Sequence, residues 1–302
     1  MPAEPGPEVL GVRHTPPIFS VPSGACDCHV HIFESPERFP FSARRVFTPA
    51  VATVADLRAR QAALGLDRAV IVQPSPYGTD NRCLAESLRT LGKRARGIAV
   101  IDHDTSDAEL EELHALGVRG VRINLETVGQ RDPALARDAL EYAARRVGPL
   151  GWHVQVYTHL DVIAALRDVL PNLAAPVMID HYGRASAALG TTQPGFAELL
   201  ELLRSGRLYI KLSAPHRISS HPAFADVAEI VSAFIEAAPD HAVWASDWPH
   251  GGAWPGVRRS PDVIEPFHPI DDGSALNHLH GWLSGEQLRK VLVVNPARIY
   301  GF

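Results

Sequence analysis

The sequence lacks several features that define other classes of protein. No apolar run is long enough to cross a membrane, and no charged segment followed by an apolar core opens the chain. The formal net charge is -5, and lysine and arginine form no block, which excludes the basic surface of a nucleic-acid-binding protein. The three cysteines are too few for a disulfide framework. We therefore expect a cytoplasmic protein that binds neither membrane nor nucleic acid.

Internal repeats, interdomain linkers and a dinucleotide motif are also missing. No Gly-x-Gly-x-x-Gly follows an early strand, which argues against a dinucleotide-binding fold. The 302 residues are 46% hydrophobic, which is enough to bury a full core. Six prolines among residues 1–24 oppose both helix and strand pairing there. We predict a surface arm over 1–24 and a single domain over 25–302.

The chain does contain a regular alternation of short apolar strands and helical stretches. The predicted strands are 27–33, 68–73, 97–101, 120–124, 153–157, 177–181, 208–212 and 242–246. The predicted helices are 54–65, 81–91, 106–116, 133–147, 160–170, 194–205 and 224–238, and closing helices occupy roughly 274–293. Nearly continuous apolar strands are typical of parallel sheets covered on both faces. Eight βα units predict an α/β fold, a (β/α)8 TIM barrel, with the doubly wound open sheet as the alternative.

The first predicted strand carries two histidines, His29 and His31, separated by one residue. Because side chains alternate along a strand, both imidazoles face the same way. Such a pair can hold a cation or direct two hydrogen bonds at one substrate oxygen. On its own the pattern is equally compatible with a buried, hydrogen-bonded pair.

Other polar residues follow the later strands, where a barrel places its active site. His181 and Asp247 end the sixth and eighth strands, so they can form one site with His29 and His31. Three imidazoles and a carboxylate suit Zn²⁺ or a similar cation, and the carboxylate can also act as a general base. No lysine ends a central strand, so we expect no carbamylated lysine and no binuclear site.

Arginines at strand ends predict an anionic ligand, because a partly buried guanidinium needs a partner and binds carboxylates bidentately. Hydroxyl and amide groups at the same ends are candidate donors to that ligand. The candidate substrate-binding residues are Ser75, Tyr77, Arg122, Asn124, Tyr157, Arg184 and Arg217.

Four motifs give the chain a family resemblance. They are Asp-x-His-x-His at 27–31, Asp-His-x-Gly-Arg at 180–184, Ser-Asp-Trp-Pro-His at 246–250 and the closing segment 295–302. With Gln-Pro-Ser-x-Tyr-Gly-Thr-Asp-Asn at 73–81 and Gly-Val-Arg-x-Asn at 120–124, they resemble the lactonase branch of the amidohydrolase superfamily. The resemblance covers about residues 25–302.

The resemblance implies hydrolysis of a cyclic ester in which Asp247 acts on water and His250 is its neighbour. It also implies that His29, His31 and His181 polarise the lactone carbonyl, and it carries over Ser75, Arg122, Tyr157 and Arg217 as substrate contacts. Relatives work with or without a metal, so the cofactor is either none or one divalent ion held by His29, His31, His181 and Asp247.

One residue departs from the pattern of this family, and the difference concerns substrate binding. A second arginine expected six residues after Arg122 is Val128 here, so either Arg131 replaces it or one carboxylate contact is lost. We predict a hydrolase for a small anionic lactone of the pyrone-dicarboxylate, muconolactone or sugar-acid kind, in a monomer or homo-oligomer. The alternatives are a metal-dependent nonoxidative decarboxylase, a lactone isomerase, and a binding protein without turnover.

Overall fold

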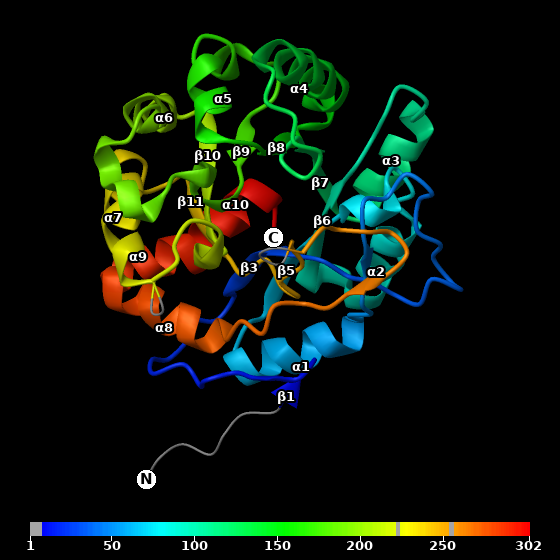
Figure 1. The fold of residues 1–302 in the computed structure, drawn as a ribbon, viewed down its shortest axis with the longest axis horizontal. Helices are drawn as coiled ribbons and strands as arrows, with labels where there is room; N and C mark the ends of the chain where they lie inside the picture. The colour runs from blue at the N-terminus through cyan, green and yellow to red at the C-terminus, as the bar shows by residue number, and fades with distance from the viewer. Residues whose placement is uncertain (1–7, 222–223, 254–256) are drawn as a thin grey trace. The chain divides into compact units, whose positions relative to one another are not determined.

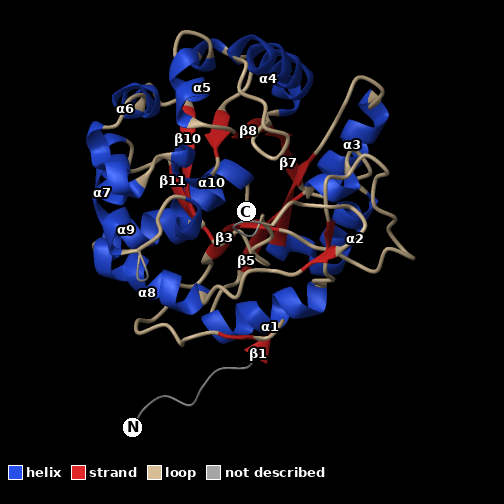
Figure 2. Cartoon of the chain, viewed as in Figure 1, coloured by secondary structure: helices blue, strands red, loops and turns tan. Residues whose placement is uncertain are grey.

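The computed structural model describes residues 8–221, 224–253 and 257–302. Eight strands form one sheet whose order follows the order of the chain, and helical segments separate successive strands (Figure 2). This succession is that of a (β/α)8 barrel, and the predicted fold class is confirmed. No helix in the described part of the chain is long and apolar enough to span a bilayer.

The chain forms two compact units. The first unit is Met1–Val118, Ser246–His280 and Phe302, and the second is Arg119–Ala245 with Gly281–Gly301. The first unit contains strands β3 (Cys26–Val30), β5 (Arg68–Val72) and β6 (Ala95–Ala99), helices α1 (Val54–Leu64), α2 (Arg82–Leu91) and α3 (Asp107–Ala115), and most of α8 (Asp272–Trp282). Strands β3, β5 and β6 pair in parallel.

The second unit contains the remaining five strands of the sheet. They are β7 (Val118–Asn124, apart from its first residue), β8 (His153–Tyr157), β9 (Val177–Ile179), β10 (Leu208–Ser213) and β11 (Ala242–Ala245). Its helices are α4 (Pro133–Val147), α5 (Leu160–Ala165), α6 (Phe196–Arg204), α7 (Ala228–Ala237), α9 (Gly285–Arg289) and α10 (Asn295–Tyr300). Helices α4 to α7 lie beside these strands, with α4 packed on β8 and α6 on β10 (Figure 1).

The ends of helix α1 follow from its sequence. Thr53 accepts a hydrogen bond from the Asp56 amide, and the Asp56 carboxylate accepts one from the Thr53 amide, which forms a capping box. Gly65 then ends the helix in a left-handed conformation, with φ 69°. The face that α1 buries carries an arginine, Arg60, next to Leu57 and Leu64 at helical spacing.

The predicted arm at the N-terminus contains structure that the prolines were expected to prevent. Residues 1–7 lie outside the described residues, but β1 (Glu8–Val9) and β2 (Val12–Arg13) pair as a small antiparallel hairpin. The expectation of no strand pairing was wrong there because the six residues from 8 to 13 contain no proline, and Gly11 turns the chain with φ 76°. The assignment of 1–24 as an arm and 25–302 as the domain stays a prediction.

Several element boundaries also differ from the predicted ones. Strand β6 spans Ala95–Ala99, two residues earlier than predicted at both ends, and within it the Arg96 guanidinium carbon lies 4.6 Å from the centre of the Phe302 ring. Helix α5 ends at Ala165, five residues before the predicted end, and a 3-10 turn that contains a proline follows at Leu170–Asn172. Helix α7 begins only at Ala228. The closing segment forms separate helices, as expected, because Ser284 caps a new helix, α9.

His153 in β8 makes the stability of the fold depend on pH. Burial, with a contribution from nearby Lys211, lowers the pKa of His153 to about 3. Between that value and the unfolded pKa of about 6.5, only the unfolded chain takes up the proton, so stability falls as pH falls. We expect His153→Gln to weaken the loss of unfolding free energy between pH 7.5 and pH 5, measured by urea denaturation. An unchanged pH dependence would contradict this assignment.

Candidate active site

Three of the predicted catalytic residues converge within the first unit. The Nε2 atoms of His29 and His31 lie 3.2 Å apart, and each is 3.5 Å from Oδ1 of Asp247. All three residues are buried. The two histidines therefore face the same way, as strand alternation predicts, and the carboxylate that meets them comes from a segment more than 200 residues later in the chain.

The tautomer of His31 is fixed by the backbone. Its Nδ1 lies 2.8 Å from the carbonyl oxygen of Val72 in β5, which can only accept a hydrogen bond. Nδ1 therefore carries the proton, and Nε2 offers a lone pair toward His29 and Asp247. A lone pair in this position can accept a hydrogen bond from substrate or water, or bind a cation.

The spacing of these atoms also fits a metal ion. Ligands bound tetrahedrally at about 2.0–2.1 Å lie about 3.4 Å from one another. The three separations of 3.2, 3.5 and 3.5 Å agree with that geometry, and His29, His31 and Asp247 together form a group able to hold an ion. Two imidazoles and one carboxylate suit a borderline divalent cation such as Zn²⁺.

The segment that carries Asp247 follows β11 and has an unusual backbone. Asp247 and His250 both adopt left-handed conformations, with φ 73° and 69°. Such conformations cost non-glycine residues about 1–3 kcal/mol and persist only where surrounding contacts hold them. The Asp247 amide donates to the His29 carbonyl at 3.0 Å, and the His250 amide donates to the Asp247 carbonyl at 2.8 Å.

A buried ion network underlies this segment, and the sequence did not predict it. Arg60 donates to Asp27 at 2.9 Å and to Asp272 at 2.6 Å, and all three side chains are at most 1% exposed. Asp272 also lies 3.1 Å from Nε2 of His250. The signal available in the sequence was an arginine on the apolar face of a predicted helix.

The two carboxylates of this network respond differently to burial. Burial raises the pKa of Asp27, and the favourable contacts from Arg60 and Ser246 do not fully offset it. Burial alone would also raise the pKa of Asp272, but Arg60 and His250 lower it below its ordinary value.

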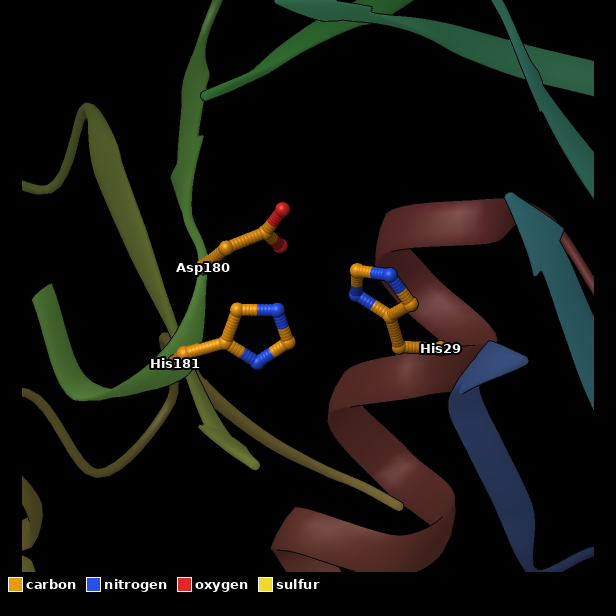
Figure 3. A group of neighbouring side chains, drawn as sticks. All are labelled: His29, Asp180 and His181. Atoms are coloured by element: carbon orange, nitrogen blue, oxygen red, sulfur yellow. The ribbon is translucent and has the colours of Figure 1, made fainter. Parts of the chain in front are cut away.

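The second unit carries His181, the remaining member of the predicted quartet. Asp180 and His181 follow β9 consecutively, and Figure 3 shows both side chains; His29, also labelled there, belongs to the first unit. Nδ1 of His181 lies 2.8 Å from the Ser213 hydroxyl at the end of β10, and its ring meets the edge of the Tyr157 ring. The backbone of His181 is left-handed, with φ 48°.

Asp180 lies in a buried cluster that contains a lysine missed in the sequence. Lys211 is inside β10 rather than at its end, and its Nζ lies 2.6 Å from Oε1 of Gln155 and 3.3 Å from Asp180. The Gln155 amide donates to the same carboxylate at 2.9 Å. Lys211, Gln155 and Asp180 are each 0% exposed. The lysine is therefore already committed to a carboxylate in the core.

Two of the predicted arginines gather around Tyr157. The guanidinium carbons of Arg122 and Arg217 each lie 5.9 Å from the centre of the Tyr157 ring. Arg122 Nε is 3.8 Å from Asp180 and makes no hydrogen bond to any of the described residues. Arg184 donates to the Arg217 carbonyl at 2.8 Å and pairs with Glu126. The charge of Arg184 is therefore partly balanced by Glu126.

The other predicted substrate contacts have local partners. The Tyr77 hydroxyl accepts a hydrogen bond from the Glu34 amide at 3.1 Å, and burial raises the pKa of Tyr77 well above its usual value. The Asn124 side chain closes a turn with Thr127. Ser75 is half-buried at the start of a 3-10 turn after β5.

The position of the missing arginine is exposed. Val128 is 67% exposed. Arg131 lies 3.0 Å from His159 and 3.6 Å from Asp161, and its side chain is 59% exposed. The guanidinium of Arg131 thus already has two partners within the second unit.

Imidazoles and carboxylates at or just beyond the ends of parallel strands are the arrangement of a (β/α)8 enzyme. A model of the amidohydrolase family matches residues 26–302, and the chain belongs to that family. It is 35% identical over 295 residues to a 2-pyrone-4,6-dicarboxylate hydrolase of Comamonas testosteroni, covering 94% of this chain and 92% of the relative.

Two further comparisons agree with this assignment. A 4-sulfomuconolactone hydrolase of Hydrogenophaga intermedia is 32% identical over 305 residues, covering 99% of this chain and 96% of the relative. The solved structure of a putative 2-pyrone-4,6-dicarboxylic acid hydrolase from Pseudomonas putida matches with a TM-score of 0.77 at 31% identity, over 93% of this chain and 98% of that one. The resemblance inferred from the motifs is confirmed.

Proposed function

We propose that this enzyme hydrolyses the cyclic ester of a small lactone that bears a carboxylate or similar anion. The observation that carries the proposal is the buried convergence of His29, His31 and Asp247 in a chain related over most of its length to lactone hydrolases. In this reaction Asp247 takes a proton from water as the water oxygen attacks the ring carbonyl. The carbonyl–ring oxygen bond then breaks, and the leaving ring oxygen takes up the proton that Asp247 removed from water.

The charge that develops on the carbonyl oxygen needs electrophilic help. We assign this help to His29, and to His181 from the second unit, as hydrogen-bond donors. His31 would contribute through the lone pair on its Nε2, which can accept a hydrogen bond from His29 or bind an ion. A divalent ion held by His29, His31 and Asp247 would act as a Lewis acid on the same oxygen. Removing one such electrophile typically lowers kcat by about 10²–10³-fold.

Arg122 and Arg217 are the proposed anchors for the substrate anion. Arg122 is mostly buried and its Nε has no hydrogen-bond partner among the described residues, so an incoming carboxylate would satisfy it. We expect Arg122→Lys to raise KM by about 10–100-fold, because a lysine cannot form the bidentate pair. Steady-state kinetics on the carboxylate lactone measures this effect. An unchanged KM would rule out Arg122 as an anchor.

A lactone screen tests the proposed function. Pyrone-dicarboxylate, muconolactone and sugar-acid lactones are incubated with the enzyme, with and without chelator, and proton release is followed. Ring opening of at least one carboxylate lactone is expected. Release of CO₂ instead would indicate a decarboxylase, and binding without consumption of any lactone would indicate a protein that lost turnover. Loss of activity in chelator that is restored by added Zn²⁺ would assign the ion to the reaction.

The cellular setting is part of the same proposal. Three reduced, buried thiols, Cys26, Cys28 and Cys83, suit a reducing cytoplasm. The substrate is a free small anion, and the active form is a monomer or a homo-oligomer.

A further inference from the structure

We propose that Arg60 is a positioning residue that holds both ends of the Asp247 segment, Ser246–His250, through two buried carboxylates. The inference rests on the proposed role of Asp247 and extends it to a buried helix residue that acts through two carboxylates. Arg60 lies in α1, on the face that this helix buries. The contacts that carry the inference all lie within the first unit.

The first carboxylate, Asp27, holds the beginning of the segment. Oδ2 of Asp27 accepts from Nη1 of Arg60 at 2.9 Å and from the Ser246 hydroxyl at 2.5 Å. Its Oδ1 accepts from the Ser246 amide at 2.9 Å and from the His29 amide at 3.3 Å. One carboxylate therefore fixes the residue before Asp247 and also the backbone of a histidine that Asp247 faces.

The second carboxylate, Asp272, holds the end of the segment. Its Oδ2 accepts from Nε of Arg60 at 2.6 Å, and its Oδ1 lies 3.1 Å from Nε2 of His250. Asp272 is itself the first residue of α8, and its amide donates to His14 at 3.2 Å. The ring of His250 thus lies against the first residue of a helix.

Arg60 is suited to this bridge for a chemical reason. A planar guanidinium presents donors in a fixed fork, so it can satisfy two carboxylates in different directions at once, whereas an ammonium is a single point charge. Both carboxylates are buried and repel each other unless a cation lies between them. The left-handed backbone at Asp247 and His250 also requires contacts that hold it in place.

The test compares Arg60→Lys with Leu57→Ala, a matched control on the same buried face of α1. Leu57→Ala removes core packing without touching the bridge. Both variants are checked by circular dichroism and assayed well below their melting temperatures. Arg60→Lys is expected to lower kcat by about 10–100-fold with KM changed less than about threefold, because the general base is misplaced while the anion anchors are intact. Leu57→Ala is expected to keep kcat within about twofold of the wild type.

A double variant shows whether Arg60 acts through Asp247. In an Asp247→Asn background, adding Arg60→Lys is expected to cause no further loss of kcat, since residues acting as a unit are not additive. If the two substitutions lower kcat independently, so that their fold-losses multiply in the double variant, the proposal is overturned. If Arg60→Lys does not fold, Asp272→Asn removes only the second arm of the bridge and is expected to lower kcat without raising KM.

Hydrogen exchange tests the positioning role of Arg60 independently of the proposed lactone hydrolysis. Amides in a peptide spanning residues 243–253 are expected to exchange faster in Arg60→Lys than in Leu57→Ala, whether or not a lactone is consumed. If the wild type opens no lactone, the proposed function fails while exchange still decides the positioning role. Equal exchange in both variants, or wild-type kcat in Arg60→Lys, would overturn the role of Arg60.

Discussion

Asp247→Asn is expected to lower kcat by about 10²–10⁴-fold, because an amide cannot take the proton from water. The substitution preserves size, and the amide of residue 247 still donates to the His29 carbonyl, so the fold is expected to remain. Single-turnover and steady-state rates on the same lactone measure the effect. The variant also removes one of three candidate metal ligands, so metal content is determined alongside the rates.

The control for this prediction is Asp168→Asn. Its side chain is 92% exposed, and the same chemical change there is expected to leave kcat unaltered. Turnover near the wild-type rate in Asp247→Asn would exclude this residue as the general base. If kcat does fall, circular dichroism shows whether the variant is still folded, which distinguishes loss of the general base from unfolding.

Lys211→Met is expected to lower the free energy of unfolding by about 3–5 kcal/mol, because it leaves Asp180 buried without its ammonium partner. Lys211 and Asp180 are both 0% exposed and 3.3 Å apart, and the Gln155 oxygen bound by the lysine would lose its donor. Arg122 is too far from Asp180, at 3.8 Å, to replace a direct hydrogen bond without moving. Guanidinium denaturation monitored by fluorescence measures the change.

The matched control is Lys290→Met, at the surface. Lys290 pairs with Asp240 at 3.1 Å, but the two side chains are 31% and 51% exposed. Pairs of that kind contribute about 0–1 kcal/mol, so a small change is expected. If the two lysine variants lose the same stability, the buried cluster of Lys211, Gln155 and Asp180 does not stabilise the fold as predicted.

The regular part of the fold was predictable because it depends on local sequence. Strand β8 and helix α4 have the predicted bounds, since the apolar periodicity of each is undisturbed along its whole length. The pairing of His29 with His31 follows from strand alternation, and the placement of Asp247 beyond β11 follows from the fold class.

The buried charges were not predictable in the same way. Arg60 and Asp272 are 212 residues apart in sequence, so no local pattern connects them, and an arginine within a helix is most often a solvated charge. Lys211 was not predicted because a barrel collects its functional residues at strand ends, whereas this lysine lies within β10 and finds its partners in β8 and directly after β9. Such residues are recognised only when their partners are seen.

The most direct test of the proposed reaction is hydrolysis of a carboxylate lactone in H₂¹⁸O, with the product examined by mass spectrometry. Attack of water on the ring carbonyl predicts one ¹⁸O atom in the newly formed carboxylate, and the label should appear far more slowly with Asp247→Asn. An isomerised lactone without label, or a product that has lost CO₂, would contradict the proposal that this enzyme opens a lactone with water.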